Sequence, residues 1–355
     1  MKALDGYYDE QELPLLIQRR GMVEWRDGKV RLLDRRRLPH ETVFVDCDHV
    51  EEVAKAIEDM LIQGATTLSI AGGYGLALAA QASEQVGGSE ARWRAIDAAA
   101  SRLQDTRPTG LALRRLLERG RRVARTALDR GADPTEAILE ETDAAAARIA
   151  RAGYEVGRHT NELVPDGARI LTHCFADRAL LYTLLAARAD GKDVSVYCSE
   201  TRPYLQGARL TSLSITQLGL PCTLITDSMG GFLFQRGLAD MLITAADRVC
   251  MDGSVCNKVG TYQHALAARA NAKPFYVSRA GGPDTESAGA EDVEIEMRDA
   301  DEVLSFAGDR IAPHGVDALY PAFDITPPEL VTRIVTDAGS FAPDELANYR
   351  EPVSS

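Results

Sequence analysis

Two residues of this chain could move protons, and each follows a short apolar run. Cys174 comes after ILTH, and Asp247 comes after MLITAA. A thiol near a helix start can ionise, and a carboxylate can act as a general acid or base. The competing interpretations are a buried structural thiol for Cys174 and, for Asp247, a salt bridge to Arg248 or a helix cap. Because ligands bind outside the carboxyl ends of parallel strands, the positions of both residues favour a chemical role.

Polar side chains suited to a small anionic, hydroxylated molecule accompany these two residues. Asn257 and Lys258 precede VGTYQHAL, and we expect them to open a helix whose N-terminus attracts anions. Arg202 and Asp227 follow two further apolar runs, and Arg107 precedes a helix in the N-terminal half. An arginine in such a position can hold a phosphate. For Asn257, Lys258 and Arg107, an ordinary capped helix or surface turn is the alternative.

The segments after about residue 165 predict the elements that would position these side chains. Five short apolar runs are typical of buried parallel strands: GARILTHC, DVSVYCSE, PCTLITD, ADMLITAAD and KPFYVSR. Helical segments separate them, which is the pattern of βαβ units and therefore of a parallel sheet. The glycine runs GGYG and SMGG lack the spacing of a dinucleotide fingerprint, which argues against a dehydrogenase.

The first part of the chain has a different predicted secondary structure. Residues 20–50 predict short strands around an Asp-Gly turn, and residues 50–155 are largely helical. The helix EEVAKAIEDMLIQG is expected to stop at Gly64. The expected fold class is α/β. An N-terminal α+β, helical domain at 1–160 precedes a Rossmann-like parallel-sheet domain at 161–355, which carries most of the active site.

Composition narrows the function classes. The formal net charge of −13 over 355 residues opposes binding to nucleic acid or anionic membrane. The arginine-rich segment 114–130 is best interpreted as a solvated helix face paired with nearby acids. The six cysteines form no CxxC pair, the histidines show no metal-ligand spacing, and the N-terminal segment does not look like a signal peptide. We expect a cytoplasmic protein with reduced thiols and no metal.

With these residues in view, the chain resembles the methylthioribose-1-phosphate isomerase family over about residues 20–340. That group also contains ribose-1,5-bisphosphate isomerases and regulatory subunits of the translation-initiation nucleotide exchange factor. The motifs that carry the resemblance are VEWRDGKVRLLDRRRLP, EEVAKAIEDM, GGYGLALAA, RPT, ILTHC, TRPYLQGARLT, LITDSM, ADRV, NKVGTY and YPAFDITP.

The resemblance implies an aldose–ketose isomerase that acts on a sugar 1-phosphate. It assigns the acid–base work to Cys174 and Asp247, with Asp247 at the ring oxygen and C2 hydroxyl and Cys174 at the C2 hydrogen. It implies a homodimer and no metal or organic cofactor. The substrate contacts that it implies are Gln63, Gly64, Arg107, Gln206, Asn257 and Lys258.

The chain also departs from the family pattern. Gln63 stands where the family has a phosphate-binding arginine, and Tyr320 replaces the asparagine of NPAFD. HCFAD replaces HCNAG, so that Phe175 and Asp177 take the places of an asparagine and a glycine. These changes suggest isomerase chemistry on a different sugar. The alternative is a non-catalytic sugar-phosphate or nucleotide sensor, or a regulatory protein of the same fold.

Overall fold

The computed structural model describes residues 8, 10–18, 21–108 and 110–350. The chain divides into two compact units, the first ending at Arg151 and the second beginning at Ala152. The division falls inside helix α5 (Pro134–Asn161), so that one continuous helix contributes to both units. The sequence-based boundary at residue 160 lies near the end of the same helix.

A small antiparallel sheet opens the first unit. Its strands, in sheet order, are β1 (Val23–Arg26), β2 (Lys29–Leu33) and β3 (Phe44–Cys47). Asp27 and Gly28 connect β1 to β2 with φ angles of 53° and 76°. Two successive residues with positive φ are the signature of the type I′ hairpin turn, which Asp-Gly favours.

Helices make up most of the rest of the first unit. They are α1 (Val50–Glu58), α2 (Ala65–Ala82), α3 (Ser89–Asp105), α4 (Leu111–Asp129) and the first part of α5. Helix α2 is buried along most of its length, and Gly72, Gly73 and Gly120 let α2 and its neighbours approach closely. The expectation that α1 extends to Gly64 was wrong. Helix α1 ends at Glu58, and Gly64, with φ of 90°, instead precedes the first turn of α2.

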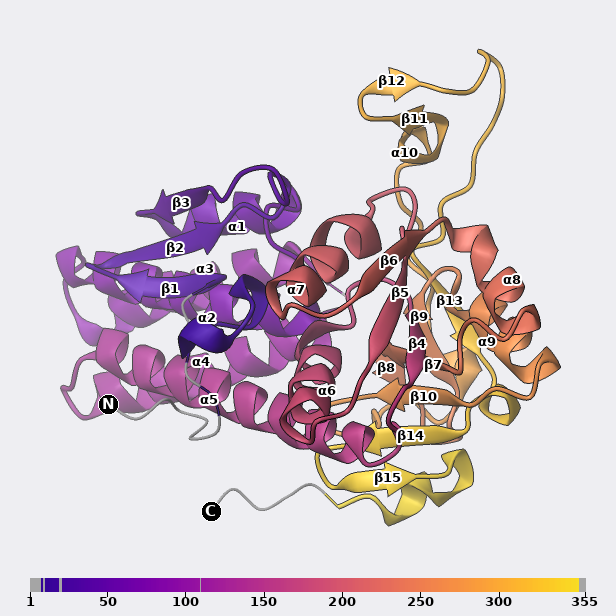
Figure 1. Ribbon diagram of the computed structural model, residues 1–355. Helices are drawn as coiled ribbons and strands as arrows, with labels where there is room; N and C mark the ends of the chain where they lie inside the picture. The colour runs from indigo at the N-terminus through magenta and orange to yellow at the C-terminus, as the bar shows by residue number, and fades with distance from the viewer. Residues whose placement is uncertain (1–7, 9, 19–20, 109, 351–355) are drawn as a thin grey trace. The chain divides into compact units, whose positions relative to one another are not determined.

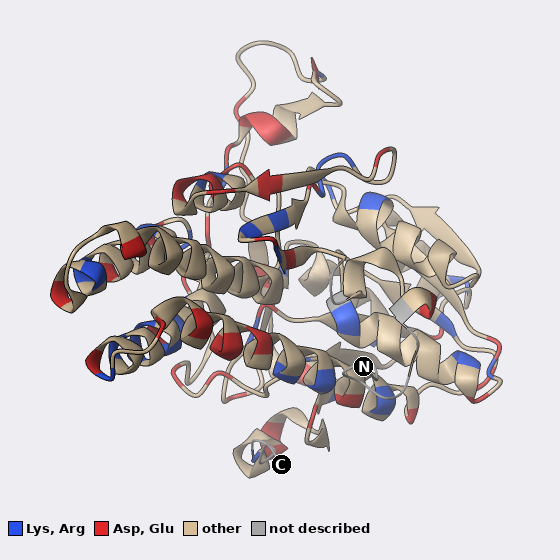
Figure 2. Ribbon diagram, turned by 90° about the vertical axis from the view of Figure 1, so that its left-hand side faces the viewer, with Lys and Arg blue, Asp and Glu red and all other residues tan. Residues whose placement is uncertain are grey.

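The arginine-rich segment forms helix α4 and is paired with acids, as expected. Arg119 bonds Glu141 at 2.8 Å, and Arg121 bonds Asp97 at 2.7 Å. Figure 2 shows acidic and basic residues interleaved along the helices of this part of the chain. The segment is therefore a charge-balanced helix face, without the excess of positive charge that polyanion binding needs.

A seven-stranded sheet forms the centre of the second unit (Figure 1). Its parallel strands are β4 (Arg169–Thr172), β5 (Ser195–Ser199), β6 (Cys222–Ile225), β7 (Met241–Ala245), β10 (Phe275–Ser278) and β14 (Arg333–Thr336). The sheet order is β6-β5-β4-β7-β10-β14, and β15 (Gly339–Phe341) adds an antiparallel edge. Numbered along the chain, the parallel strands follow the order 3-2-1-4-5-6 of doubly wound dinucleotide-binding folds.

Helices cover both faces of this sheet, with α6 and α7 on one side and α8 and α9 on the other (Figure 1). They span α6 (Asp177–Ala189), α7 (Ser212–Gln217), α8 (Gly230–Gln235) and α9 (Thr261–Ala270). A π-helical turn at Gly207–Thr211 leads into α7. The buried strand residues Leu171, Leu242, Phe275 and Val277 belong to one apolar core. The expected α/β class with a parallel sheet is confirmed.

A second, antiparallel sheet stands at the carboxyl end of the large one. Its strands are β8 (Arg248–Val249), β9 (Val255–Lys258) and β13 (Phe323–Thr326), in the order β8-β9-β13. Between β10 and β13 the chain forms the short helix α10 (Asp301–Leu304) and the hairpin β11 (Ser305–Phe306) and β12 (Asp309–Arg310). The hairpin projects from the second unit in Figure 1.

Candidate active site

The winding of the large sheet reverses between β4 and β7. These strands are hydrogen-bonded neighbours, with Leu171 opposite Leu242. Cys174 follows β4 by two residues, and Asp247 follows β7 by two residues. Doubly wound proteins bind ligands at the point where the strand order reverses, outside the carboxyl ends of the strands. The sheet order therefore brings the two proton-moving candidates to the ends of neighbouring strands at that point.

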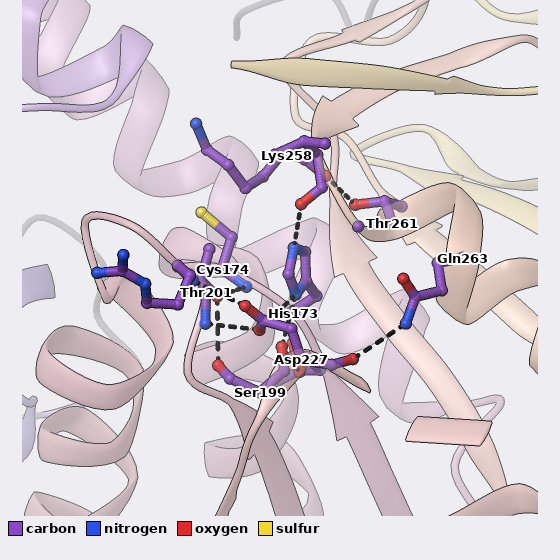
Figure 3. Close-up of polar contacts among 12 residues, drawn as sticks. His173, Cys174, Ser199, Thr201, Asp227, Lys258, Thr261 and Gln263 are labelled. Atoms are coloured by element: carbon purple, nitrogen blue, oxygen red, sulfur yellow. Dashed lines mark hydrogen bonds and ion pairs between the residues drawn. The ribbon is translucent and has the colours of Figure 1, made fainter. Parts of the chain in front are cut away.

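The backbone of Cys174 is held in an unusual conformation. Its φ angle is 63°, in the left-handed region that residues with a side chain seldom adopt. Its N–H donates to the Thr201 hydroxyl at 3.0 Å, and its carbonyl accepts from the Thr211 hydroxyl at 2.6 Å. The half-buried Cys174 thiol and the Lys258 amine point toward the same side of the cluster in Figure 3. Strained residues held in this way gather at functional sites.

The loop after β5 is braced by Asp227. The Asp227 carboxylate accepts the backbone N–H groups of Thr201 and Arg202, both at 2.7 Å. Thr201 and Leu205 also have positive φ angles, 65° and 63°. Asp227 thus serves as a structural brace that holds the Thr201 hydroxyl against Cys174. The Arg202 guanidinium was expected among the ligand-binding groups, but it donates to the carbonyls of Val303 and Ser305 at 3.2 and 3.0 Å.

Asp247 has the surroundings of a functional carboxyl group. Its side chain is exposed to solvent, while the surrounding protein raises its pKa mainly through desolvation. Lys258, Arg279 and Arg298 oppose that rise. The salt-bridge interpretation fails, because Arg248 lies 3.4 Å from the Asp284 carboxylate and also donates to Ser287. A carboxyl group that is both accessible to solvent and partly desolvated is poised to exchange protons.

Asn257 and Lys258 do not open a helix, contrary to expectation. They end strand β9, and α9 begins three residues later at Thr261. Asn257 donates to the Thr261 hydroxyl at 3.0 Å. The two residues lie in a strand because β9 pairs with β13, a segment more than sixty residues further along the chain.

Lys258 is a buried cation. Only 4% of its surface is exposed, and its Nζ has no hydrogen-bond partner within the part of the chain that the structure describes. The ammonium lies 4.9 Å from the centroid of the Phe323 ring. Burial lowers the pKa of Lys258, while the neighbouring Cys174 and Asp247 raise it. A buried ammonium without a hydrogen-bond acceptor is suited to capture an anionic group of a ligand.

Gln206 is the remaining predicted contact in the second unit. It precedes the π-helical turn whose Thr211 holds Cys174, and 5% of its surface is exposed. Its Oε1 has no hydrogen-bond partner among the described residues. The close approach of Gly207 to the Ser199 carbonyl fixes this loop, because a Cβ at position 207 would overlap that oxygen.

Three predicted contacts belong to the first unit. Gln63 and Gly64 stand before α2, and the Arg35 guanidinium donates to the Gln63 carbonyl. Arg107 donates to the carbonyl of Ile57 at 3.1 Å and to that of Thr106 at 3.2 Å. Of the residues at which the chain departs from the family pattern, Asp177 begins α6, but its side chain lies outside what the structure describes.

Sequence reasoning missed several charged residues near Asp247. Arg279 follows β10, the strand beside β7, and its guanidinium donates to the Ala246 carbonyl at 3.4 Å. Arg298 and Glu296 form an ion pair at 2.9 Å in the segment before α10. Arg279 could have been found from its position at a strand end. No local signal marks Arg298, because it reaches the site through distant pairing.

His173 has a structural role and does not pair with Cys174. Its ring bonds the Ser199 hydroxyl on one side and the Val259 carbonyl at 2.8 Å on the other (Figure 3). His264 stacks edge-on against it with ring centroids 5.1 Å apart. Burial lowers the pKa of His173 to about 4 and that of His264 to about 3. Both rings are therefore neutral near pH 7.

The chain is similar to known proteins over most of its length. The sequence matches the Initiation factor 2 subunit family over residues 61–343. The chain belongs to this family. It is 41% identical to methylthioribose-1-phosphate isomerase of Desulforudis audaxviator over 339 residues, covering 93% of this chain and 97% of the relative. It is 42% identical to the Roseiflexus castenholzii protein of the same name, covering 93% and 96%.

Two solved structures resemble the whole chain. 5-Methylthioribose 1-phosphate isomerase from Pyrococcus horikoshii is 33% identical with a TM-score of 0.84, covering 96% of this chain and 97% of that one. Translation initiation factor eIF-2B subunit delta from A. fulgidus is 35% identical with a TM-score of 0.81, covering 92% of this chain and 96% of that one. The resemblance drawn from the motifs is thereby confirmed, and the curated relatives support isomerase chemistry.

Two further observations concern the chain as a whole. Among the described residues, no helix is long and apolar enough to cross a membrane.

All six cysteines lie in the described part, and none of them forms a disulfide. Burial raises the pKa of Cys47 and Cys250 to about 11 and that of Cys256 to about 12, so these thiols are unreactive packing groups.

Proposed function

We propose that this chain is an aldose–ketose isomerase that converts a 5-substituted ribose 1-phosphate into the corresponding ribulose 1-phosphate. One observation carries the proposal. Cys174 and Asp247 follow the two strands at the reversal point of the sheet, and a buried ammonium, that of Lys258, interacts electrostatically with both. The names of the curated relatives support the same reaction class.

The reaction moves two hydrogens within one molecule. The proton of the C2 hydroxyl ends on the ring oxygen as the bond from C1 to that oxygen breaks. The hydrogen on C2 ends on C1, which leaves a carbonyl at C2 and an open-chain ketose that still carries its phosphate. Asp247 suits the first transfer, because a carboxyl group can accept and return a proton, and desolvation raises the pKa of this one above its ordinary value. Cys174 suits the second transfer.

The phosphate would be captured by fixed donors rather than by the net charge of the chain, which is negative. Lys258 supplies a buried ammonium that lacks a hydrogen-bond partner among the described residues, and Asn257 supplies an amide beside it. The family pattern also implies substrate contacts at Gln63, Gly64, Arg107 and Gln206. Since Gln63 replaces an arginine of that pattern, we propose that the chain prefers a sugar other than methylthioribose 1-phosphate.

The proposed assembly is a homodimer. Large apolar side chains are exposed on neighbouring elements of the second unit, with Phe232 56% and Leu266 44% exposed. They lie on α8 and α9. These helices pack together, because a Cβ added at Gly231 of α8 would lie 3.9 Å from the Ala267 Cβ of α9. Exposed patches of this kind mark sites of association.

The test is phosphorus and proton NMR of the purified protein with 1-phosphates of 5-methylthioribose, 5-deoxyribose and ribose, and with ribose 1,5-bisphosphate. Conversion of any of these to a ribulose 1-phosphate supports the proposal and ranks the C5 substituents. The absence of turnover with all four, from a folded protein, contradicts it. That outcome favours the second candidate, a non-catalytic regulatory protein, which the likeness to the eIF-2B subunit from A. fulgidus also suggests.

A further inference from the structure

Two cations share one aromatic ring beside the candidate site. Strands β9 and β13 place Lys258 directly opposite Phe323. The Lys258 Nζ lies 4.9 Å from the centroid of the Phe323 ring, and the Arg298 guanidinium carbon lies 5.9 Å from the same centroid. The face of an aromatic ring attracts cations, so that Phe323 offsets part of the repulsion between them.

Arg298 is held more firmly than Lys258. Its Nε donates to the Glu296 carboxylate at 2.9 Å, and its backbone N–H donates to the Tyr320 carbonyl at 2.9 Å. Its guanidinium also lies 6.0 Å from the centroid of the Tyr320 ring, and 16% of its side chain is exposed. Tyr320 is itself buried. The guanidinium is therefore fixed between two rings and a carboxylate.

Arg298 interacts electrostatically with the proposed phosphate-binding lysine, Lys258, and with the proposed acid–base carboxylate, Asp247. It lowers the pKa of Lys258 and that of Asp247. The charged groups that act on Lys258 are Cys174, Arg298, Asp247 and Glu296, and those that act on Asp247 are Lys258, Arg279, Arg298 and Glu296. Arg298 and Glu296 thus influence the pKa values of both Lys258 and Asp247.

We propose that Arg298 is a positioning residue of this site, which fixes the Phe323 ring and thereby the Lys258 amine beside Cys174 and Asp247. The effect of Arg298 on turnover rests on the proposed function, because it requires that the chain be an isomerase. The Phe323 ring, Cys174 and Asp247 favour the buried ammonium, while the charge of Arg298 opposes it. The ring and the fixed guanidinium keep it aimed at the place where an anionic group of the substrate would bind.

The first test does not depend on turnover. The chain contains six lysines, so labelling lysine Cε with carbon-13 gives few signals, and Lys258→Arg assigns the one of interest. The variants are Arg298→Gln and Glu296→Gln, with Arg236→Gln as the control because Arg236 is exposed on the same unit. Each is titrated by NMR as the full-length chain.

The two variants are expected to shift the Lys258 titration in opposite directions. Arg298→Gln removes a charge that lowers the Lys258 pKa, so the midpoint moves up. Glu296→Gln removes a charge that raises it, so the midpoint moves down, and Arg236→Gln leaves it in place. A Lys258 midpoint that is the same in both variants and the wild type overturns the proposal. If Arg298→Gln does not fold, Glu296→Gln still decides it.

The second test uses the pH dependence of kcat/KM. Arg298→Gln is expected to lower kcat/KM by about 10- to 100-fold and to move both limbs of the profile to higher pH, with partial rescue by Arg298→Lys. A uniform loss with unmoved limbs indicates a merely structural role and overturns the proposal. If the wild type turns over no sugar 1-phosphate, the proposed function fails, while the lysine titration still decides the role of Arg298.

Discussion

At the scale of single residues, the site combines strain, burial and unmatched charge. Cys174 and Thr201 have left-handed backbones, and the Lys258 amine lacks a hydrogen-bond partner among the described residues. Each of these features costs free energy of folding, of the order of 1–3 kcal/mol. Destabilising features of this kind are found where they help to bind a ligand. The variants below test whether stability and function trade against each other.

Lys258→Met is expected to stabilise the protein and to weaken it as a catalyst. Methionine fills a similar volume without a charge to desolvate, so the free energy of unfolding should rise by about 1–3 kcal/mol. The KM for a sugar 1-phosphate should rise at the same time. Urea unfolding and initial-rate kinetics measure the two effects. Lys273→Met is the control, because Lys273 lies 3.6 Å from Asp240 at a partly exposed position. A variant with lower stability and unchanged KM would refute this role.

Gln63→Arg is expected to change the order of preference within the panel of sugar 1-phosphates. A charge-assisted hydrogen bond contributes about 1.5–3 kcal/mol, so a restored arginine should raise kcat/KM for methylthioribose 1-phosphate relative to the preferred substrate. Gln85→Arg adds the same charge at an exposed position of the first unit and serves as the control. An unchanged ratio of kcat/KM values would show that position 63 does not set the preference.

At the scale of elements, the sequence was most informative where signals are local. The apolar runs of β4, β5, β6, β7 and β10 are short and bounded by polar residues, and all five were predicted. Cys174 and Asp247 followed from their strand ends. The errors at Lys258 and Gly64 have a common physical cause. Strand β9 exists because it pairs with β13, and α1 stops early where Met60 adopts a φ of 59°.

Arg298 was missed because long-range pairing brings it to the site, whereas Arg279 directly follows β10 and could have been found from that position. Arg298 approaches Lys258 because the bridge from Met297 to Pro321 and the pairing of β9 with β13 bring three distant segments together. No spacing of residues in the sequence predicts that arrangement. The motif YPAFDITP was noticed for its likeness to a family, while the roles of Tyr320 and Phe323 as platforms for cations required the structure.

The buried histidine pair between β4 and α9 predicts the acid sensitivity of the fold. Unfolded histidine has a pKa near 6.5, and the folded pKa values are about 4 for His173 and about 3 for His264. The unfolded chain thus binds more protons below pH 6.5, and the free energy of unfolding falls as the pH drops through 6.5 toward 4. Asp324, with a pKa raised to about 6, acts in the opposite direction between about pH 4 and 6, but it is one group against two.

His264→Leu should remove about half of this pH-dependent loss. Urea unfolding at about pH 7.5 and about pH 5 measures the loss in the wild type and the variant. His314→Leu, at an exposed position of the same unit, should keep the full loss. Equal losses in the wild type and His264→Leu would mean that other groups govern the acid sensitivity.

At the scale of the whole molecule, the exposed apolar side chains are unevenly distributed. Apart from Val45 and Val86, every large apolar side chain that is exposed among the described residues belongs to the second unit. If the chain forms the proposed homodimer through this surface, Phe232→Glu should yield a monomer, because a charge at an apolar interface is costly to bury. Light scattering after size exclusion measures the mass. Val86→Glu should leave it unchanged, and a dimeric Phe232→Glu protein would place the interface elsewhere.

The measurement that tests the central claim most directly is the comparison of Cys174→Ser with Cys222→Ser on the best sugar 1-phosphate of the panel. Calorimetry measures binding, and NMR measures turnover. The account predicts that Cys174→Ser still binds the sugar phosphate but loses about 10²–10⁴-fold in turnover. Cys222→Ser, which alters a half-buried thiol on the edge strand β6, should retain both. Wild-type turnover in Cys174→Ser would contradict the assignment of the active site.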